Sequence, residues 1–204
     1  MSRLIKESID RFYDYDIHVE TRTIYMGSVS VDFDDESGTD ANMAERVIKG
    51  LHLLDLSAPT GDKPITIIMN NLGGDWYHGM AIYDAIKACK NHVTIVVYGY
   101  AMSMGSIILQ AADKRTMMPN SRLMIHYGTN GYYGHTKTFI KWAEETKKID
   151  IEMENIYMEK IKEKNPTFTL HKLKEMCNFD TFLSAKQTLE LGLIDSISGQ
   201  EEEV

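Results

Sequence analysis

A serine between a predicted buried strand and a predicted helix is the residue best placed for nucleophilic chemistry. Ser103 is the centre of Ala101-Met102-Ser103-Met104-Gly105, which follows the apolar run 93–98. The carboxyl ends of sheet strands form the edge where α/β proteins carry their sites, and N–H groups at a helix start can stabilise an oxyanion. The pattern is close to the Gly-x-Ser-x-Gly turn of hydrolases, with Ala101 in the first glycine's place. A simple helix cap is the alternative interpretation.

A glycine pair follows the preceding predicted strand. Asn70-Asn71-Leu72-Gly73-Gly74 comes directly after the apolar run 65–69. Adjacent glycines let the backbone approach a ligand closely and turn its N–H groups toward it, although a flexible turn has the same composition. Because neighbouring parallel strands end at the same edge of a sheet, this pair and Ser103 together favour a hydrolase site.

Seven histidines compete for the role of general base. His126 ends the apolar run Leu123-Met124-Ile125, so its imidazole should emerge at a strand end. His78 is the other serious candidate because it follows Gly74 closely. The base must lie within hydrogen-bond reach of the serine hydroxyl. The remaining histidines lie in polar or helical surroundings and are expected at the surface: His18, His52, His92, His135 and His171.

The elements that must position these residues alternate between strand and helix. Apolar patterning predicts strands at 23–26, 65–69, 93–98, near 117 and at 123–125, and helices at 41–54, 79–89, 103–112 and 137–162. Ser184-Ala185-Lys186-Gln187 has the form of a capping box and predicts a last short helix. The near-continuous apolar strands predict an α/β fold of βαβ units with a mainly parallel sheet. The helix at 137–162 is long enough that part of it should project from the domain.

The chain of 204 residues, 43% apolar and 25% charged, fits one globular domain. We expect residues 1–16 to form an N-terminal arm with some mobility, 17–198 a single domain and 199–204 an acidic tail. An acidic run at 32–36 resembles a calcium-binding loop, but Met43 stands where such a loop requires glutamate. We interpret it as a solvated loop.

Charge and composition exclude several classes of function. A net charge of -8 is unsuited to general nucleic-acid binding. The start of the chain lacks the apolar core of a signal peptide, and no stretch is long enough to span a membrane. Cys89 and Cys177 do not make a disulfide framework, which favours a cytoplasmic setting. No phosphate-binding loop is present, so no bound nucleotide is expected.

Four blocks of the sequence resemble the Clp protease proteolytic subunit family. These are the glycine block ending at Gly74, the serine block around Ser103, Pro119-Asn120-Ser121-Arg122-Leu123-Met124-Ile125-His126, and a late segment from Phe179 to Asp195. The match runs from about residue 65 to residue 197 in the order of the family. The resemblance implies a Clp/crotonase-type spiral of βαβ units with a long protruding handle helix, which corresponds to the helix after Thr136.

The resemblance also assigns roles to residues. It makes Ser103 the nucleophile, His126 the general base and Asp180 the group that orients the histidine, with the backbone N–H groups of Gly74 and Met104 as the oxyanion hole. Gly131 and Gly134 fall in the segment that pairs with the substrate as an added strand. The role of Asp180 rests on the resemblance alone, because the chain contains 30 acidic residues. No metal and no cofactor are implied.

The function implied is that of a serine endopeptidase subunit that hydrolyses peptide bonds through an acyl-enzyme. Such subunits assemble as homo-oligomers of two stacked seven-membered rings and receive unfolded polypeptides from an AAA+ unfoldase. Neither nucleic acid nor a membrane is an expected partner.

The sequence departs from the family at several positions. Asn71 and Leu72 replace a serine and a proline, Gly128 replaces a proline, and the segment around Lys164-Asn165-Pro166 is longer than usual. The region before residue 65 matches poorly, which leaves the choice of unfoldase open.

Two other functions stay open. One is a crotonase-like acyl-CoA enzyme, which would hold a thioester enolate with paired N–H groups. The other is a catalytically inactive structural ring subunit. An α/β-hydrolase is less favoured because its acid precedes its histidine along the chain. A cysteine hydrolase built on Cys89 or Cys177 is remote, because neither cysteine lies in a turn of the nucleophile kind.

Overall fold

The computed structural model describes residue 12 and residues 14–27 and 38–200. Most of the predicted arm, the acidic run at 32–36 and the end of the acidic tail therefore lie outside the described residues. The strands are β1 (Ile17–His18), β2 (Thr23–Gly27), β3 (Ile65–Asn71), β4 (Val93–Met102), β5 (Lys114–Met117), β6 (Arg122–Ile125), β7 (Thr181–Ser184) and β8 (Ser196–Ile197). The helices are α2 (Ala41–Leu56), α3 (Trp76–Lys87), α4 (Met104–Ile108), α5 (Thr136–Lys164), α6 (Leu170–Cys177) and α7 (Ala185–Leu191), and a 3-10 turn, η1 (Leu109–Ala111), follows α4.

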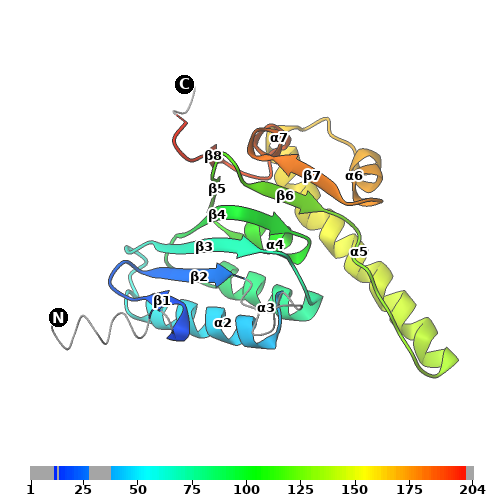
Figure 1. Ribbon diagram of the computed structural model, residues 1–204, viewed down its shortest axis with the longest axis horizontal. Coiled ribbons are helices and arrows are strands. Elements are labelled where there is room, and N and C mark those ends of the chain that lie inside the picture. Colours follow the sequence, from blue (N-terminus) through cyan, green and yellow to red (C-terminus); the bar gives the residue numbers. More distant parts are fainter. Residues whose placement is uncertain (1–11, 13, 28–37, 201–204) are drawn as a thin grey trace.

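The sheet is mainly parallel, as predicted. Its order is β1-β2-β3-β4-β5-β8, in which β1 alone is antiparallel to its neighbour. The strand β6 pairs in parallel with β4 and in antiparallel with β7. Figure 1 shows α2 and α3 covering one face of this sheet.

The central strand β4 pairs with two different strands along its length on the same side. Its first half pairs with β5 over Thr94–Val97, and its second half pairs with β6 from Tyr100 to Met102. The change falls at Gly99, whose φ of 74° lies in the left-handed region that glycine adopts without strain. The observed strand is therefore longer than the predicted 93–98, because Tyr100, Ala101 and Met102 beyond Gly99 pair with a different strand.

Helix starts are set by side-chain caps rather than by apolar spacing. Asp75 accepts a hydrogen bond from the N–H of His78, so α3 begins three residues before the start predicted at Gly79. Asp40 caps α2 in the same way. The capping box predicted at Ser184 is confirmed at the start of α7. The core between sheet and helices is apolar, with Ile67, Leu51 and similar side chains fully buried.

The helix α5 is a handle that leaves the domain. It has 29 residues, and its buried side chains, Met153, Glu154, Tyr157 and Ile161, all lie in its second half. Its first half projects beyond the rest of the molecule in Figure 1. The prediction of a long protruding helix is thereby confirmed.

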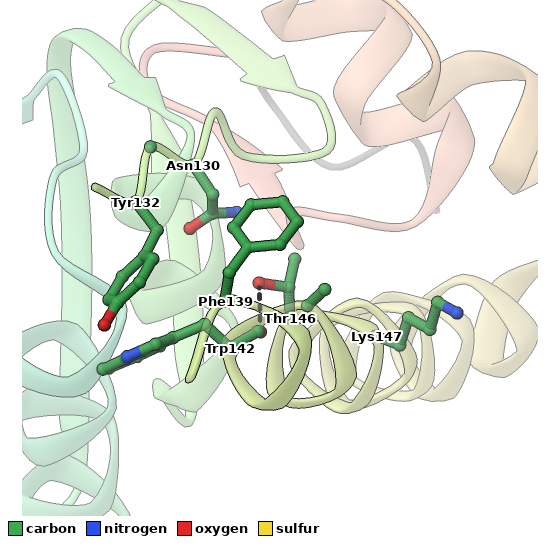
Figure 2. A pocket seen from close by; sticks show the side chains of 8 residues that line it. Asn130, Tyr132, Phe139, Trp142, Thr146 and Lys147 are labelled. Carbon is green, nitrogen blue, oxygen red and sulfur yellow. Dashed lines mark hydrogen bonds between the residues drawn. The ribbon is translucent and has the colours of Figure 1, made fainter. Parts of the chain in front are cut away.

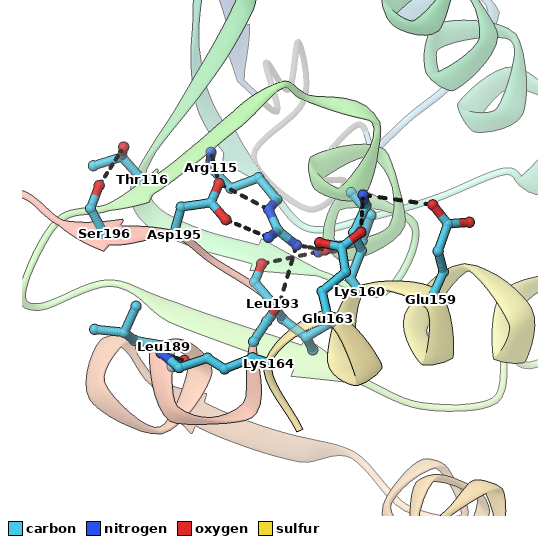
Figure 3. Close-up of polar contacts among 12 residues, drawn as sticks. Arg115, Thr116, Glu159, Lys160, Glu163, Lys164, Leu189, Leu193, Asp195 and Ser196 are labelled. Atoms are coloured by element: carbon cyan, nitrogen blue, oxygen red, sulfur yellow. Dashed lines mark hydrogen bonds and ion pairs between the residues drawn. The ribbon is translucent and has the colours of Figure 1, made fainter. Parts of the chain in front are cut away.

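A buried arginine fastens the last strand of the sheet. Arg115 in β5 pairs with Asp195, which lies just before β8 (Figure 3). Its guanidinium also donates to the side chain of Gln110 and to the carbonyl of Gly192. The backbone N–H of Arg115 donates to Asp195 as well, at 2.7 Å. The ion pair thus ties β5, the turn after α4 and the end of α7 together.

Candidate active site

Ser103 lies at the sharp turn between β4 and α4. Its backbone has φ 50° and ψ -123°, a left-handed conformation that is unfavourable for a residue with a side chain. Hydrogen bonds to both of its backbone polar groups hold it there. Its N–H donates to the carbonyl of Met124 at 2.9 Å, and its own carbonyl accepts from the Ser106 hydroxyl at 2.6 Å. The turn exposes the side chain at the carboxyl edge of the sheet, as the sequence predicted.

His126 reaches Ser103 because β6 runs beside the end of β4. Met124 in β6 is in register with Met102 in β4, so the residues after them meet. The His126 Nε2 lies 2.8 Å from the Ser103 Oγ. With the ring proton on Nδ1, Nε2 accepts the serine hydroxyl proton, which is the arrangement of a general base.

Asp180 completes a chain of three side chains. It directly precedes β7, and the pairing of Ile125 with Thr181 sets it beside His126. The His126 Nδ1 lies 2.8 Å from Asp180 Oδ1. The histidine side chain is 19% exposed and the aspartate 60% exposed, so the outer end of the chain faces solvent.

His78, the other candidate for the general base, is not part of this set of hydrogen-bonded side chains. His78 lies in the first turn of α3, where its backbone N–H is bonded to Asp75. It is not among the residues that line the cavity around Ser103.

The glycine pair packs directly against the serine turn. A Cβ added at Gly73 would lie 2.6 Å from Ser103 Cβ and 2.9 Å from the Met104 nitrogen, so only glycine fits there. Gly73 and Gly74 have φ of 101° and 142°, which also favours glycine. Among the described residues, the N–H groups of Gly74 and Met104 have no hydrogen-bond acceptor, and both residues line the cavity that contains Ser103.

Asn71 explains how this loop keeps its shape without the family's proline. Its side chain is fully buried, and its Oδ1 accepts from the Gly73 N–H at 2.8 Å and from the Thr39 hydroxyl at 3.2 Å. The backbone of Thr39 in turn bonds the carbonyl of Gly73 and the N–H of Asp75. The side-chain bonds of Asn71 therefore fix the turn that a proline ring would otherwise constrain.

A cavity of about 590 Å³ opens in front of Ser103 and His126. Its floor and walls combine apolar side chains with a few polar ones. It is lined by Gly74, Asp75, Trp76, Tyr77, Ser103, Met104, Ile107, His126, Gly128, Thr129, Asn130, Trp142, Thr146, Ile149, Asp150 and Met153.

The two glycines predicted to hold substrate lie outside this cavity. Gly131 lines a neighbouring hollow of about 460 Å³ between the loop after β6 and the start of α5. Figure 2 shows Tyr132, Phe139 and Trp142 around that hollow. Gly134 lines neither space. Gly128, Thr129 and Asn130 of the same loop do line the serine cavity, so the segment is close to the site although the predicted residues are not in contact with it.

A second polar network lies behind the histidine. The Tyr127 hydroxyl donates to the buried Glu154 at 2.5 Å, and Lys174 lies 3.3 Å from the same carboxylate. Burial raises the pKa of Tyr127, and the bond to Glu154 raises it further. This network joins the loop after β6 to α5 and α6, and so holds the segment that carries His126.

Among the described residues, no cluster of three or more histidine, cysteine, aspartate or glutamate side chains could hold a metal ion. No helix there combines the length and apolarity needed to cross a bilayer.

A mainly parallel sheet with a serine turn at its carboxyl edge and a protruding helix defines an α/β protein of the Clp/crotonase type. The comparisons agree with this class. The family model for Clp protease matches residues 21–201. The ATP-dependent Clp protease proteolytic subunit of Deinococcus radiodurans is 34% identical over 197 residues, covering 95% of this chain and 89% of that protein. The chain belongs to the Clp protease family, a family of peptidases.

Several residues that support the site are not identified by the predictions above. Asn71 is one of them, although the polar Asn70-Asn71 pair before two glycines is a signal for a side-chain-bonded turn. Ser106 and the buried Tyr157, which lie 2.6 Å apart, gave no local signal because 51 positions separate them.

Proposed function

We propose that this protein is a serine endopeptidase subunit in which Ser103 is the nucleophile, His126 the general base and Asp180 the orienting acid. The observation that carries the proposal is the continuous chain of two 2.8 Å contacts from the serine hydroxyl through the imidazole to the carboxylate. A neutral hydroxyl is a poor nucleophile, and a base at this distance removes its proton as it attacks.

The reaction follows from this geometry. The Ser103 Oγ attacks the peptide carbonyl carbon while its proton passes to His126 Nε2. The carbonyl oxygen becomes an oxyanion, which the free N–H groups of Gly74 and Met104 stabilise. The C–N bond then breaks as the imidazolium returns its proton to the leaving amine. Water repeats the same steps on the acyl-enzyme and releases the acid.

Asp180 accepts from Nδ1 and thereby fixes the tautomer in which Nε2 is the base. It also stabilises the imidazolium that forms during attack. The loop after β6, which includes Gly131 and Gly134, pairs with the substrate as an added strand beside the cavity.

We propose further that residues 17–198 form one domain that assembles into stacked rings of identical subunits in the cytoplasm. The handle α5 joins the two rings, and an AAA+ unfoldase supplies unfolded polypeptide. The support is membership of the family and the projecting first half of α5.

The test is the variant Ser103→Ala in a preparation free of other peptidases. We expect hydrolysis of a short fluorogenic peptide to fall on the order of a millionfold, to background. The oligomer, measured by particle mass, should be unchanged. Turnover that persists in the variant would contradict the proposal.

A non-hydrolytic function predicts a different result. A crotonase-like enzyme needs the paired N–H groups but not the serine, and an inactive ring subunit would assemble without reacting. Labelling of the wild type at Ser103 by a fluorophosphonate separates both from a peptidase, because the reagent reacts only with an activated serine. Absence of labelling would favour the alternatives.

A further inference from the structure

The cavity in front of Ser103 carries two carboxylates, and its described lining contains no lysine or arginine. The carboxylates are those of Asp75 and Asp150. Most of the remaining wall is apolar or aromatic. A cavity of this kind attracts a cation that is attached to an apolar stem.

The two carboxylates differ in whether they have hydrogen-bond partners among the described residues. Asp75 caps α3 and accepts from the N–H of His78 at 2.9 Å. Asp150 lies in the middle of α5, and within the described part of the chain its carboxylate takes part in no hydrogen bond or ion pair. A half-buried carboxylate without a partner is costly, and it is the group that gains most from a ligand cation.

The helix α5 places Asp150 among the residues that line the cavity. Trp142, Thr146, Asp150 and Met153 line the cavity at spacings of three or four residues, which puts them on one face of the helix, and the adjacent Ile149 lines it as well. Tryptophan and aliphatic side chains on this face can pack along the methylene stem of a lysine or an arginine.

The described charged side chains near Asp150 do not form an ion pair with it, so its carboxylate can bind a ligand cation. Lys174 is engaged by Glu154 at 3.3 Å, and Glu154 also accepts from Tyr127. Burial raises the pKa of the Asp150 carboxyl, Glu154 adds to this effect, and Lys174 opposes it. A cation that entered the cavity would favour the ionised carboxylate in the way that a paired lysine does.

We propose that Asp150 makes this site select substrates with lysine or arginine at the residue that supplies the scissile carbonyl. The inference rests on the peptidase function proposed above. The carbonyl of that residue lies in the oxyanion hole, so its side chain is the one nearest to the walls of the same cavity. Acidic side chains at this position would be repelled by both carboxylates.

The experiment uses two peptidyl diphenyl phosphonates that differ only in carrying a lysine-like or a norleucine-like side chain next to phosphorus. The Ser103 oxygen displaces phenoxide at phosphorus, and the rate of the mass gain at Ser103 in the assembled full-length protein is measured. We expect the lysine-like reagent to react about ten- to a hundredfold faster, the range set by a hydrogen-bonded charge.

Asp150→Asn keeps the shape and removes the charge, so we expect it to reduce this ratio to about one. The matched control is Glu152→Gln, which removes the same charge from an exposed position two residues away on α5 and should keep the ratio. A small uncharged fluorophosphonate should still label Ser103 in all three proteins, which establishes that the serine is intact, and the phosphonate ratio is compared within each protein.

Equal rates for the two phosphonates in the wild type would overturn the inference and leave the peptidase function standing. The same holds if Asp150→Asn keeps the preference for lysine. Failure of every reagent, the small fluorophosphonate included, to label Ser103 would instead contradict the proposed function and the inference with it.

Discussion

At the scale of single residues, the turn that carries Ser103 is tied to the handle helix by one buried pair of hydroxyls. The Ser106 Oγ lies 2.6 Å from the Ser103 carbonyl and 2.6 Å from the Tyr157 hydroxyl. Tyr157 is fully buried, and burial raises its pKa. Neither residue contacts the cavity, so both act on the reaction only by positioning the backbone of Ser103.

The variant Tyr157→Phe tests this positioning role. It removes one buried hydrogen bond, and we expect the free energy of unfolding to fall by about 1 kcal/mol. Because Ser106 then loses one of its two partners, kcat should fall while KM stays the same. Both are measured with a fluorogenic peptide alongside thermal unfolding.

Tyr15→Phe is the control, because Tyr15 is 63% exposed and does not line the cavity around Ser103. It should change neither quantity. A rise of KM in Tyr157→Phe without a change of kcat would show that the tyrosine contributes to substrate binding instead.

The sequence identifies the site residues unequally. Ser103 and His126 each end a recognisable apolar strand, so their types and positions predict chemistry. Asp180 has no such signal, because its closeness to His126 depends on the antiparallel pairing of β6 with β7. That pairing joins residues more than fifty positions apart, and only the family resemblance pointed to it.

At the scale of elements, α3 packs against α4 at a glycine. A Cβ added at Gly79 would overlap the Met104 side chain and would lie 2.7 Å from its sulfur. Met104 is also the residue whose N–H we assign to the oxyanion hole. The distance between these two helices therefore sets the position of that N–H.

We predict that Gly79→Ala lowers kcat about tenfold or more, because Met104 must move and an oxyanion donor contributes about a hundredfold or more. Alanine gains about 1 kcal/mol of helix propensity, but crowding in a packed core costs about 1–3 kcal/mol. The net change in stability should thus be small. Steady-state kinetics and thermal unfolding give both values, and unchanged kinetics would contradict the assignment of Met104.

The pair of Arg115 and Asp195 gives a prediction that depends on pH. Burial alone would raise the pKa of Asp195, but its bonds to Arg115 outweigh burial and hold the pKa below the ordinary value of 3.8. A carboxyl with a lowered pKa stabilises the fold above its unfolded value and loses that contribution as pH falls through its folded value.

Asp195→Asn leaves the guanidinium of Arg115, which is 6% exposed, without its counter-ion. We expect a loss of about 1–3 kcal/mol at pH 7, moderated because Asp195 itself is partly exposed. The difference in the free energy of unfolding between Asp195→Asn and the wild type should stay constant down to about pH 5. It should shrink as the pH falls below 3.8, the ordinary pKa of the carboxyl. Denaturant unfolding at a series of pH values measures it, and a difference that grows in acid would refute the explanation.

The main elements of the fold could be predicted because their apolar patterns are strong, and the failures have physical causes. The second half of β4 lies outside the predicted strand because Gly99 interrupts the apolar run, and the residues beyond it pair with β6 instead of β5. The short helix α6 was missed because eight residues with two buried side chains, Leu173 and Cys177, give little periodic signal. It occupies the segment that the sequence had marked as longer than usual.

At the scale of the whole molecule, the exposed first half of the handle is where another copy of the chain would bind. Phe139, Ile140 and Trp142 are each about half exposed, and Tyr132 packs near two of them around the hollow in Figure 2. Apolar side chains that protrude on a helix are normally covered by a partner.

We predict that Phe139→Glu separates the two rings of the proposed assembly, because it places a charge in a contact that would have to exclude water. Particle mass by native mass spectrometry should fall by half. Lys162→Glu, which changes an exposed charge in the second half of the same helix, serves as the control and should leave the mass unchanged. A double-ring mass in Phe139→Glu would mean that the handle does not join the rings.

The left-handed backbone at Ser103 has a consequence for how this subunit would change over evolutionary time. At φ 50° glycine has less backbone strain than any residue with a side chain. In a lineage that no longer needed the hydroxyl, the substitution Ser103→Gly would therefore increase the stability of the fold. A serine retained in that conformation is what continued selection for reactivity would leave behind.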